Sequence, residues 1–280
     1  MRQRRVRNLD EKLAGFEDVI IDLPQDMPGR WREAFCNDAP VYLEIGCGKG
    51  QFIASCARKY PQANFIGIEG QRSVLLRALQ KCRSDVEGSM APEKRRDGRQ
   101  GGQLTTEAVN VLFVSGFVHD VRDFFDPGEL SGIFLNFSDP WPKARHEKRR
   151  LTYRKRLLSY MSVLAPGGFV EFRTDNDALF DFTLEEIEAA GLEAEVVTRD
   201  LHGMWAEASS GKTADAPLNL LAGTASATDE QQSAVPDTCG ITTEYEDKFA
   251  TKGKNINFVR IVNKSGESLS KDIEFFVVKG

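Results

Sequence analysis

Short apolar runs alternate along this chain with stretches in which apolar residues recur every three or four positions. The runs that predict buried strands cover residues 41–45, 64–68, 109–114, 132–137 and 168–172. The stretches that predict helices with one buried face cover residues 52–57, 74–82 and 157–164. Because strands and helices alternate, the pattern predicts an α/β fold with a parallel sheet covered by helices on both faces.

Later segments extend this pattern and interrupt it. Further candidate strands cover residues 194–198, 256–262 and 273–278, the last two as a hairpin around 263–266. Two stretches of small and polar residues predict inserted mobile loops, at about 84–107 and 206–240. We therefore divide the chain into a basic N-terminal arm and lead-in (1–40), one domain with both insertions (41–262), and a C-terminal extension with a candidate added strand (263–280).

Composition is ordinary for a soluble globular protein. Hydrophobic residues make up 41% and charged residues 28% of the 280 residues, and no apolar run approaches the ~18 residues of a membrane span. The basic N-terminus is not followed by the apolar stretch of a secretory signal, so we expect a cytoplasmic protein without a membrane partner. The five cysteines form no CxxC pair and no zinc-ligand grouping with the three histidines, so we expect reduced thiols and no metal site.

Charge is distributed unevenly along the chain. The net charge of −5 disfavours a nucleic-acid partner, because phosphate contacts need Lys and Arg. However, eight Lys or Arg residues and a single acid lie between Lys143 and Arg156, and four Arg residues lie within the first seven positions. Two basic patches on an acidic background favour a phosphate-rich substrate. A charged surface loop, or the exposed face of the following helix, is the alternative for the longer patch.

A glycine turn follows the first predicted strand. Its sequence is Glu44-Ile-Gly46-Cys-Gly48-Lys-Gly50, and a predicted helix begins directly after it. Glycines allow a sharp turn and a close approach of a ligand, and a helix N-terminus offers unpaired N–H donors, so we expect a nucleotide-like ligand here. The spacing is GxGxG, whereas dinucleotide-binding turns have GxGxxG, which favours S-adenosylmethionine over NAD.

Two acidic residues accompany this turn. Glu69 closes the second predicted strand, where a carboxylate can accept two hydrogen bonds from a ribose diol. Glu44 precedes the turn and is placed to accept from the ammonium of a methionine moiety. A solvated strand end is the alternative for either residue alone, but their combination with the glycines favours an S-adenosylmethionine site.

The fourth predicted strand leads directly into Ser138 and Asp139. Pro140 and Pro142 fix the backbone after them and stop the strand, so the Asp139 carboxylate is presented at the carboxyl end of the sheet, beside the cofactor. Trp141 and His146 are candidate stacking surfaces within the basic run. A rigid exit turn without chemistry is the alternative.

Several motifs together resemble the bacterial tRNA (guanine-N7-)-methyltransferases. They are EIGCGKGQF (44–52), FIGIE (65–69), NFSDPWPKARHEKRRLTY (136–153), RTDN (173–176) and TEYEDKF (243–249). The resemblance runs from about Arg5 to Arg260. It implies a class I S-adenosylmethionine-dependent methyltransferase fold, which is Rossmann-like with a mostly parallel seven-stranded sheet, and methylation of a guanine N7 in tRNA, usually at position 46 in the variable loop.

The resemblance also implies roles for individual residues. It assigns Glu44, Glu69 and Asp139 to the cofactor site, to which the turn itself assigns Gly46, Gly48 and Gly50, and Asp139 is also the expected catalytic residue. It assigns contacts with the target nucleotide to Lys143, Asp175, Thr243, Glu244, Tyr245 and Glu246. This chain departs from the family at one cofactor position, because Phe117 aligns where an Asp or Asn usually reads the adenine edge. A backbone N–H can still meet the adenine there.

Methylation at guanine N7 does not require a proton to be removed from the base beforehand. The N7 atom carries an in-plane lone pair, so the reaction needs alignment and stabilisation of developing positive charge rather than a strong general base. Asp139 suits both tasks, Asp175 could orient the base from its Watson–Crick edge, and Lys143 would hold a phosphate or the base O6. Thr243 and Glu246 are also spaced as a helix capping box, which is the structural alternative for that segment.

Other functions compete with this interpretation. They are a class I methyltransferase acting on another RNA position or on a small molecule, a non-catalytic RNA-binding protein on the same fold, and an NAD-linked oxidoreductase. The basic run disfavours the small molecule, the intact glycine turn with Asp139 disfavours the non-catalytic protein, and the glycine spacing disfavours NAD. The sequence leaves the oligomeric state open between monomer and homodimer.

Overall fold

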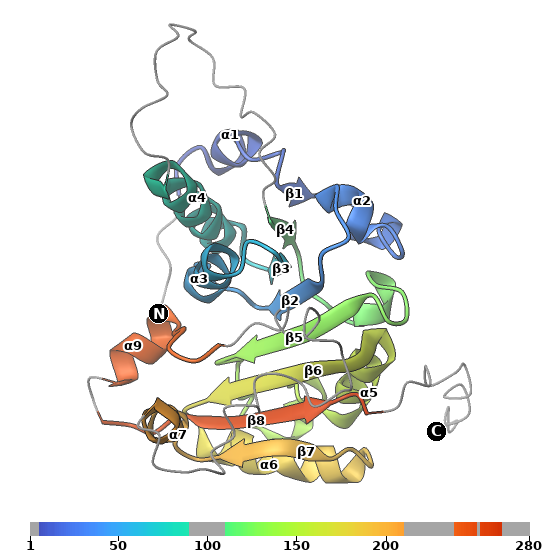
Figure 1. Cartoon of the computed structure of the whole chain (residues 1–280), viewed down its shortest axis with the longest axis vertical. Coiled ribbons are helices and arrows are strands. Elements are labelled where there is room, and N and C mark those ends of the chain that lie inside the picture. Colours follow the sequence, from blue (N-terminus) through green and yellow to red (C-terminus); the bar gives the residue numbers. More distant parts are fainter. Residues whose placement is uncertain (1–5, 90–109, 210–237, 251–252, 265–280) are drawn as a thin grey trace, which may run out of the picture.

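The computed structural model describes residues 6–89, 110–209, 238–250 and 253–264 (Figure 1). The α-helices are α1 (Leu9–Ala14), α2 (Trp31–Phe35), α3 (Gln51–Lys59), α4 (Arg72–Ser89), α5 (Arg154–Val163), α6 (Asp177–Ala189), α7 (Leu201–Ser209) and α9 (Glu244–Ala250). Short 3-10 helices are η1 (Pro24–Asp26), η3 (Val121–Asp123) and η4 (Ala144–Arg149). The strands are β1 (Ile20–Ile21), β2 (Val41–Ile45), β3 (Asn64–Glu69), β4 (Val111–Ser115), β5 (Leu130–Asn136), β6 (Leu164–Thr174), β7 (Ala194–Thr198) and β8 (Asn257–Val262).

These strands form one eight-stranded sheet in the order β1-β4-β3-β2-β5-β6-β8-β7. The pairs from β1 to β6 are parallel, and β8 runs antiparallel to both of its neighbours. The expected α/β class with a mostly parallel sheet is therefore confirmed. The expected count of seven strands is wrong by one, because β1 is a two-residue edge strand, too short to show an alternating pattern.

Most of the predicted strands coincide with observed ones. Residues 41–45 and 194–198 match β2 and β7 at both ends, and the other predicted strands in the described part of the chain differ from β3, β4, β5, β6 and β8 by a few residues at their ends. The candidate strand 273–278 lies outside the described residues, as do the middle parts of both predicted insertions. The described ends of the insertions are ordered, since α4 runs to Ser89, α7 runs to Ser209, and Thr238 is buried.

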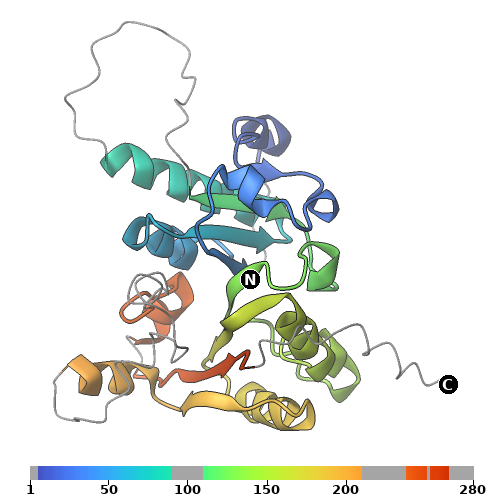
Figure 2. The same ribbon diagram turned by 45° about the vertical axis from the view of Figure 1, so that its right-hand side comes forward.

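Helices cover both faces of the sheet (Figure 2), and alternation along each strand divides the core between these faces. In β2, Val41, Leu43 and Ile45 pack with α2, α5 and α6 on one face. Tyr42 points to the opposite face, into a second cluster with α3 and α4. This alternation is what a sheet covered on both sides requires. No helix in the described part of the chain is long and apolar enough to cross a membrane.

The lead-in before β2 belongs to this core. Trp31 is fully buried, stacks on Phe125 with ring centroids 5.1 Å apart, and donates its indole N–H to the Phe124 carbonyl at 2.8 Å. The described part of the lead-in, residues 6–40, therefore packs on the same sheet rather than forming a separate unit.

The connection order places a topological switch beside β2. From β2 the chain proceeds outward through β3 to β4, and then returns to the other side of β2 as β5. Ligands of open α/β sheets bind at the carboxyl ends of strands at such a switch point. Figures 1 and 2 show α9 at this end of the sheet, beyond the arrowheads of β5 and β6.

Candidate active site

The glycine turn between β2 and α3 adopts the conformation that its glycines permit. Gly46, Gly48 and Gly50 all have positive φ, at 78°, 58° and 75°. A methyl group on Gly50 would lie 2.7 Å from the Ala78 side chain, so this glycine lets α3 pack against α4. Gly46 and Gly48 have open space where a side chain would stand, so a ligand can approach the backbone closely.

Glu69 is bound to this turn. Its Oε2 atom accepts from the Gly48 N–H at 3.1 Å, and Oε1 accepts from the Gln71 N–H at 2.7 Å. Partial burial raises the pKa of Glu69, and the nearby charge of Asp139 adds to this rise. Glu69, at the end of β3, therefore lies close to both the glycine turn and Asp139, as the sequence predicted.

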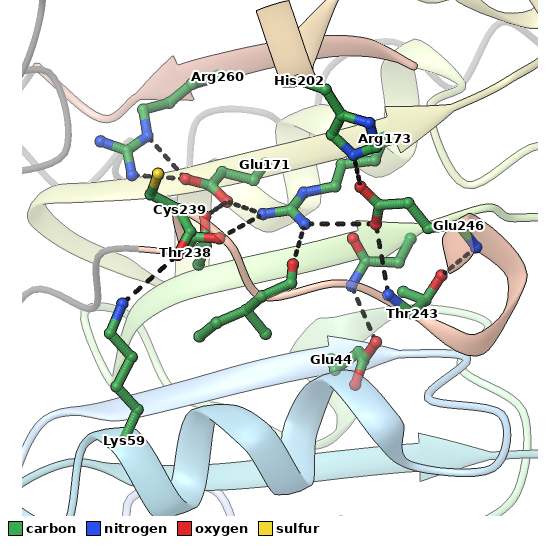
Figure 3. Close-up of polar contacts among 12 residues, drawn as sticks. Glu44, Lys59, Glu171, Arg173, His202, Thr238, Cys239, Thr243, Glu246 and Arg260 are labelled. Atoms are coloured by element: carbon green, nitrogen blue, oxygen red, sulfur yellow. Dashed lines mark hydrogen bonds and ion pairs between the residues drawn. The ribbon is translucent and has the colours of Figure 1, made fainter. Parts of the chain in front are cut away.

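Glu44 lies at the bottom of a cavity of about 290 Å³ between the glycine turn and α9. Its Oε1 atom accepts from the Asn136 side-chain amide at 2.9 Å, a bond drawn in Figure 3. Burial raises the pKa of Glu44 to about 7, although the bond from Asn136 and the charge of Arg173 oppose part of this rise. The cavity is lined by Glu44, Gly46, Cys47, Gly48, Lys49, Gln51, Phe52, Asn136, Phe137, Thr243, Glu244, Tyr245 and Lys248.

The segment after β5 has an unusual backbone. Phe137 and Trp141, on either side of Asp139, have φ values of 50° and 41°, which non-glycine residues seldom adopt. Arg150 braces this segment, because its guanidinium donates to the carbonyl of Pro140 at 3.0 Å and to that of Trp141 at 3.1 Å. Asp139 itself is exposed. A held, strained loop that presents one exposed carboxylate is typical of a functional site.

Phe117 lies on the loop after β4 and is 71% exposed. Its ring covers Gly70, because a methyl group on that glycine would lie 2.2 Å from the ring. Val118 is buried beside it, and its carbonyl accepts from the Arg156 side chain at 3.0 Å. A fixed loop thus holds a large exposed apolar ring over Gly70, the residue directly after Glu69.

Residues 238–250, which we call the strap, are fastened to the sheet by buried charges (Figure 3). Arg173 on β6 is fully buried and donates to the carbonyl of Ile241 at 2.7 Å. The same guanidinium lies 3.7 Å from Glu246, which is also fully buried and whose other oxygen lies 2.7 Å from His202. A buried charge needs such partners, so this network fixes the position of the strap.

A second pair completes the buried network. Glu171 accepts from Arg260 at 2.5 and 3.1 Å and from the Thr238 hydroxyl at 3.1 Å. Residues 171 and 173 point to the same face of β6, on either side of Phe172, and the charged Arg260 faces them from β8. Sequence reasoning missed this cluster, although charges at alternating positions in a buried strand were a signal for it.

The other side of the strap is held by the cofactor half of the sheet. Glu244 lies 2.5 Å from the Lys49 ammonium and 3.1 Å from that of Lys81. Gln51 at the start of α3 donates to Asp247 at 2.7 Å. Because Lys49 belongs to the glycine turn, the strap connects the predicted cofactor site with β6 and β8.

Comparisons with known proteins agree with this geometry. A family model described as "Putative methyltransferase" matches residues 38–215. The tRNA (guanine-N(7)-)-methyltransferase of Bacillus subtilis (strain 168) is 36% identical over 256 residues, which cover 91% of this chain and 96% of that protein. The protein of the same name from Geobacillus kaustophilus (strain HTA426) is 37% identical, with coverage of 91% and 94%.

This chain belongs to the tRNA (guanine-N7-)-methyltransferase family. The membership confirms the resemblance seen in the motifs. A solved structure described as an antibiotic-related methyltransferase superposes with a TM-score of 0.51, covers 86% of this chain and 94% of its own, and is 15% identical. At that identity it shows the shared fold alone, which is the class I methyltransferase fold expected from the sequence.

In this methyltransferase, two of the residues expected to contact the target nucleotide, Tyr245 and Asp175, lie together, and a third, Lys143, lies apart from them. Tyr245 is 43% exposed at the cavity and packs on Phe137 with ring centroids 5.0 Å apart. Asp175 contacts the Tyr245 hydroxyl and lies 3.6 Å from the Lys254 ammonium. Lys143 is exposed before η4, away from the cavity lining.

Thr243 and Glu246 form the capping box that their spacing predicted. The Glu246 N–H donates to the Thr243 hydroxyl at 3.0 Å, and the Thr243 N–H donates to a Glu246 oxygen at 3.3 Å. Glu246 has both oxygens engaged in the protein, and Glu244 is paired with two lysines. These two acids therefore hold the strap in this structure, and Tyr245 is the exposed residue among positions 243–246.

Replacing Thr243 with alanine removes the cap and should lower the free energy of unfolding by about 1 kcal/mol. The expected fall in melting temperature is roughly 2–4 °C for a chain of this size, measured by circular dichroism. Thr243→Ser keeps the hydroxyl and should melt near the parent. Equal melting temperatures for the alanine variant and the parent would show that the cap contributes nothing.

No group of three or more His, Cys, Asp or Glu residues that could hold a metal ion occurs within the described ranges. None of the five cysteines, all of which lie in the described ranges, forms a disulfide, and burial raises the pKa of Cys47 and Cys56 well above the ordinary value. Neither buried thiol is therefore set up as a nucleophile.

Proposed function

We propose that this chain transfers the methyl group of S-adenosylmethionine to N7 of a guanine in tRNA, at position 46 in the variable loop. The observation that carries the proposal is the close relationship, over nearly the whole chain, to proteins named tRNA (guanine-N(7)-)-methyltransferase. The geometry supports it, because an exposed carboxylate, a glycine turn and a basic segment meet at one end of the sheet. A tRNA substrate also implies that the enzyme works in the cytoplasm.

The residues of the turn fit S-adenosylmethionine. Gly46 and Gly48 leave room beside the backbone, and Glu69 is held by Gly48 at the strand tip where a ribose diol would be bound. Phe117 offers a flat apolar surface next to that site, suited to the adenine ring. Glu44 faces the cavity, where it would meet the methionine end.

The bound cofactor supplies an electrophilic methyl group on a sulfonium. Guanine N7 already has a lone pair, so the protein contributes alignment and electrostatics rather than proton removal. Asp139 is the exposed charge of the braced loop, and its carboxylate would stabilise the positive charge that develops on the base. Phe137 and Trp141, two positions to either side of Asp139, have strained backbones, and Arg150 holds this loop through the carbonyls of Pro140 and Trp141.

The substrate side is formed by the strap and the ends of β5 and β6. Tyr245 presents an exposed ring on which an unstacked base could lie, and Asp175 next to it would read the Watson–Crick edge. Thr243, Glu244 and Glu246 hold the strap in place through their contacts with the protein. They would therefore contribute to nucleotide binding by positioning Tyr245. A base other than guanine would present a different Watson–Crick edge and would lose the hydrogen bonds to Asp175.

The basic segment from Lys143 to Arg150 would bind the tRNA backbone. Arg149 lies over the Trp141 ring at 4.9 Å, and His146 meets the edge of that ring at 5.7 Å. Lys143, Arg145 and Lys148 are exposed. Such a combination of cations with an aromatic surface suits phosphates and unpaired bases.

Tyr245→Ala should lower kcat/KM for tRNA roughly 5- to 100-fold, because one base–aromatic stacking contact is lost. Tyr245→Phe keeps the ring and loses only the hydroxyl contact with Asp175, so its kcat/KM should stay within about threefold of the parent. Steady-state kinetics with varied tRNA measures both. If kcat/KM fell equally in both variants, the Tyr245 hydroxyl rather than the ring would be the group that matters. If the alanine variant kept the parent kcat/KM, Tyr245 would not belong to the site.

Mapping of the methylated position tests the proposed substrate. Chemical cleavage at 7-methylguanine, followed by primer extension, should locate the methyl group at guanine 46 of a tRNA transcript. A matched transcript with adenine at that position should accept no methyl group. Methylation of that control to the same level would contradict the assigned position.

A further inference from the structure

Two polar atoms at the bottom of the cavity lack hydrogen-bond partners. Glu44 is 3% exposed, and its Oε2 atom has no partner among the described residues. The Oδ1 atom of Asn136 is likewise buried without a partner in the described part of the chain. Both residues line the cavity, so a ligand in it can reach them. Buried acceptors of this kind are costly unless something donates to them.

The orientation of the Asn136 amide follows from its neighbour. Glu44 Oε1 accepts at 2.9 Å and needs a donor, so the NH₂ group faces Glu44. The amide oxygen is then left as an acceptor. The pair thus offers one carboxylate oxygen and one amide oxygen to the same ligand, together with a negative charge.

A primary ammonium group matches this pair. It carries a positive charge and three N–H donors, whereas a carboxylate or phosphate would be repelled, and a hydroxyl has one donor and leaves the charge unpaired. The methionine portion of S-adenosylmethionine carries one such ammonium.

We propose that Asn136 is a further cofactor-binding residue, whose amide oxygen and Glu44 Oε2 together accept two hydrogen bonds from the α-ammonium of the methyl donor. The assignment rests on the proposed function. Asn136 would have a second role in this ammonium site, because its NH₂ group also holds the Glu44 carboxylate in place.

Binding of an ammonium here is linked to protonation. Burial raises the pKa of Glu44 to about 7, so the carboxyl is largely protonated at pH 6 and must lose its proton to pair with the ammonium. Cofactor affinity should therefore fall as the pH drops below 7, by up to about tenfold per pH unit. The charged, titratable and polar groups that face Glu44 are Asn136 from β5, Arg173 from β6, Glu69 from β3, Cys47 from the turn, and Cys56 with the Ile53 backbone N–H from α3.

Isothermal titration calorimetry with three ligands tests the assignment. They are S-adenosylhomocysteine, its analogue without the α-amino group, and 5′-methylthioadenosine, which lacks the whole amino-acid portion. The parent protein should bind S-adenosylhomocysteine roughly 10- to 100-fold more tightly than the desamino analogue. Between pH 7 and pH 5.5 its affinity should fall, while that of methylthioadenosine should change less than twofold.

Two variants localise the effect. Asn136→Leu and Glu44→Gln should each reduce the preference for the amino group at least fivefold, with the dissociation constant of methylthioadenosine within about threefold of the parent. The parent measurements test recognition of the ammonium even if a variant fails to fold, and the Asn136→Leu variant tests the part that Asn136 plays in it. Equal affinity of the parent for S-adenosylhomocysteine and the desamino analogue would overturn it, as would an unchanged preference in a folded Asn136→Leu variant. If the parent bound neither S-adenosylhomocysteine nor methylthioadenosine, the proposed function itself would be contradicted.

Discussion

Asp139→Ala should lower the rate of methyl transfer to tRNA by at least about 100-fold, with S-adenosylhomocysteine binding still measurable. The exposed carboxylate is the charge placed to stabilise the cationic base, and removal of one preorganised electrostatic group typically costs on the order of 10²–10³ in kcat. Single-turnover transfer of labelled methyl groups measures the chemical step directly.

Two further variants make this result interpretable. Asp139→Asn keeps the shape and loses the charge, so it should resemble the alanine variant rather than the parent. Asp123→Ala removes an exposed aspartate on η3, outside the proposed site, and should keep full activity. Near-normal transfer by Asp139→Ala would remove this residue from the catalytic role.

Arg173→Met should lower the free energy of unfolding by about 3–5 kcal/mol, the range seen when one partner of a buried ion pair is removed. The substitution leaves Glu246 without its buried cation and the Ile241 carbonyl without its donor. It also removes the contacts of the guanidinium with the Phe52 and Trp205 rings. Urea denaturation followed by circular dichroism measures the change.

Arg199→Met is the matched control for that variant. Arg199 pairs with Asp181 at 2.6 Å, but both side chains are 55% exposed, so its loss should cost at most about 1 kcal/mol. Equal costs for the two arginines would show that the buried network does not fasten the strap.

The fold was predictable wherever local pattern decides it. The run 41–45 is apolar at every position but one and is followed by glycines, so both ends of β2 were visible in the sequence. The two residues of β1 carry no pattern, and their pairing with β4 depends on the packing of the lead-in. Strand order across the switch point is a tertiary property that periodicity does not contain.

The residues of the candidate site that lie at strand ends or turns were predictable from the sequence. The hydrogen bonds between residues far apart in the chain were not. Glu44, Glu69 and Asp139 each follow a strand or precede a turn, which marks them in the sequence. Phe117 was placed by alignment with a family position, and the structure adds that its ring covers Gly70. Asn136 and Arg173 act through partners 92 and 68 residues away, so only the folded chain shows their bonds.

The most direct test of the central claim is the identity of the methylated nucleoside. The purified protein is incubated with methyl-labelled S-adenosylmethionine and unmodified tRNA, and the tRNA is then digested to nucleosides and separated by chromatography. The label should appear in 7-methylguanosine, and Asp139→Ala should yield none above background. Label in a different nucleoside, or none at all from a parent protein that binds S-adenosylmethionine, would contradict the account.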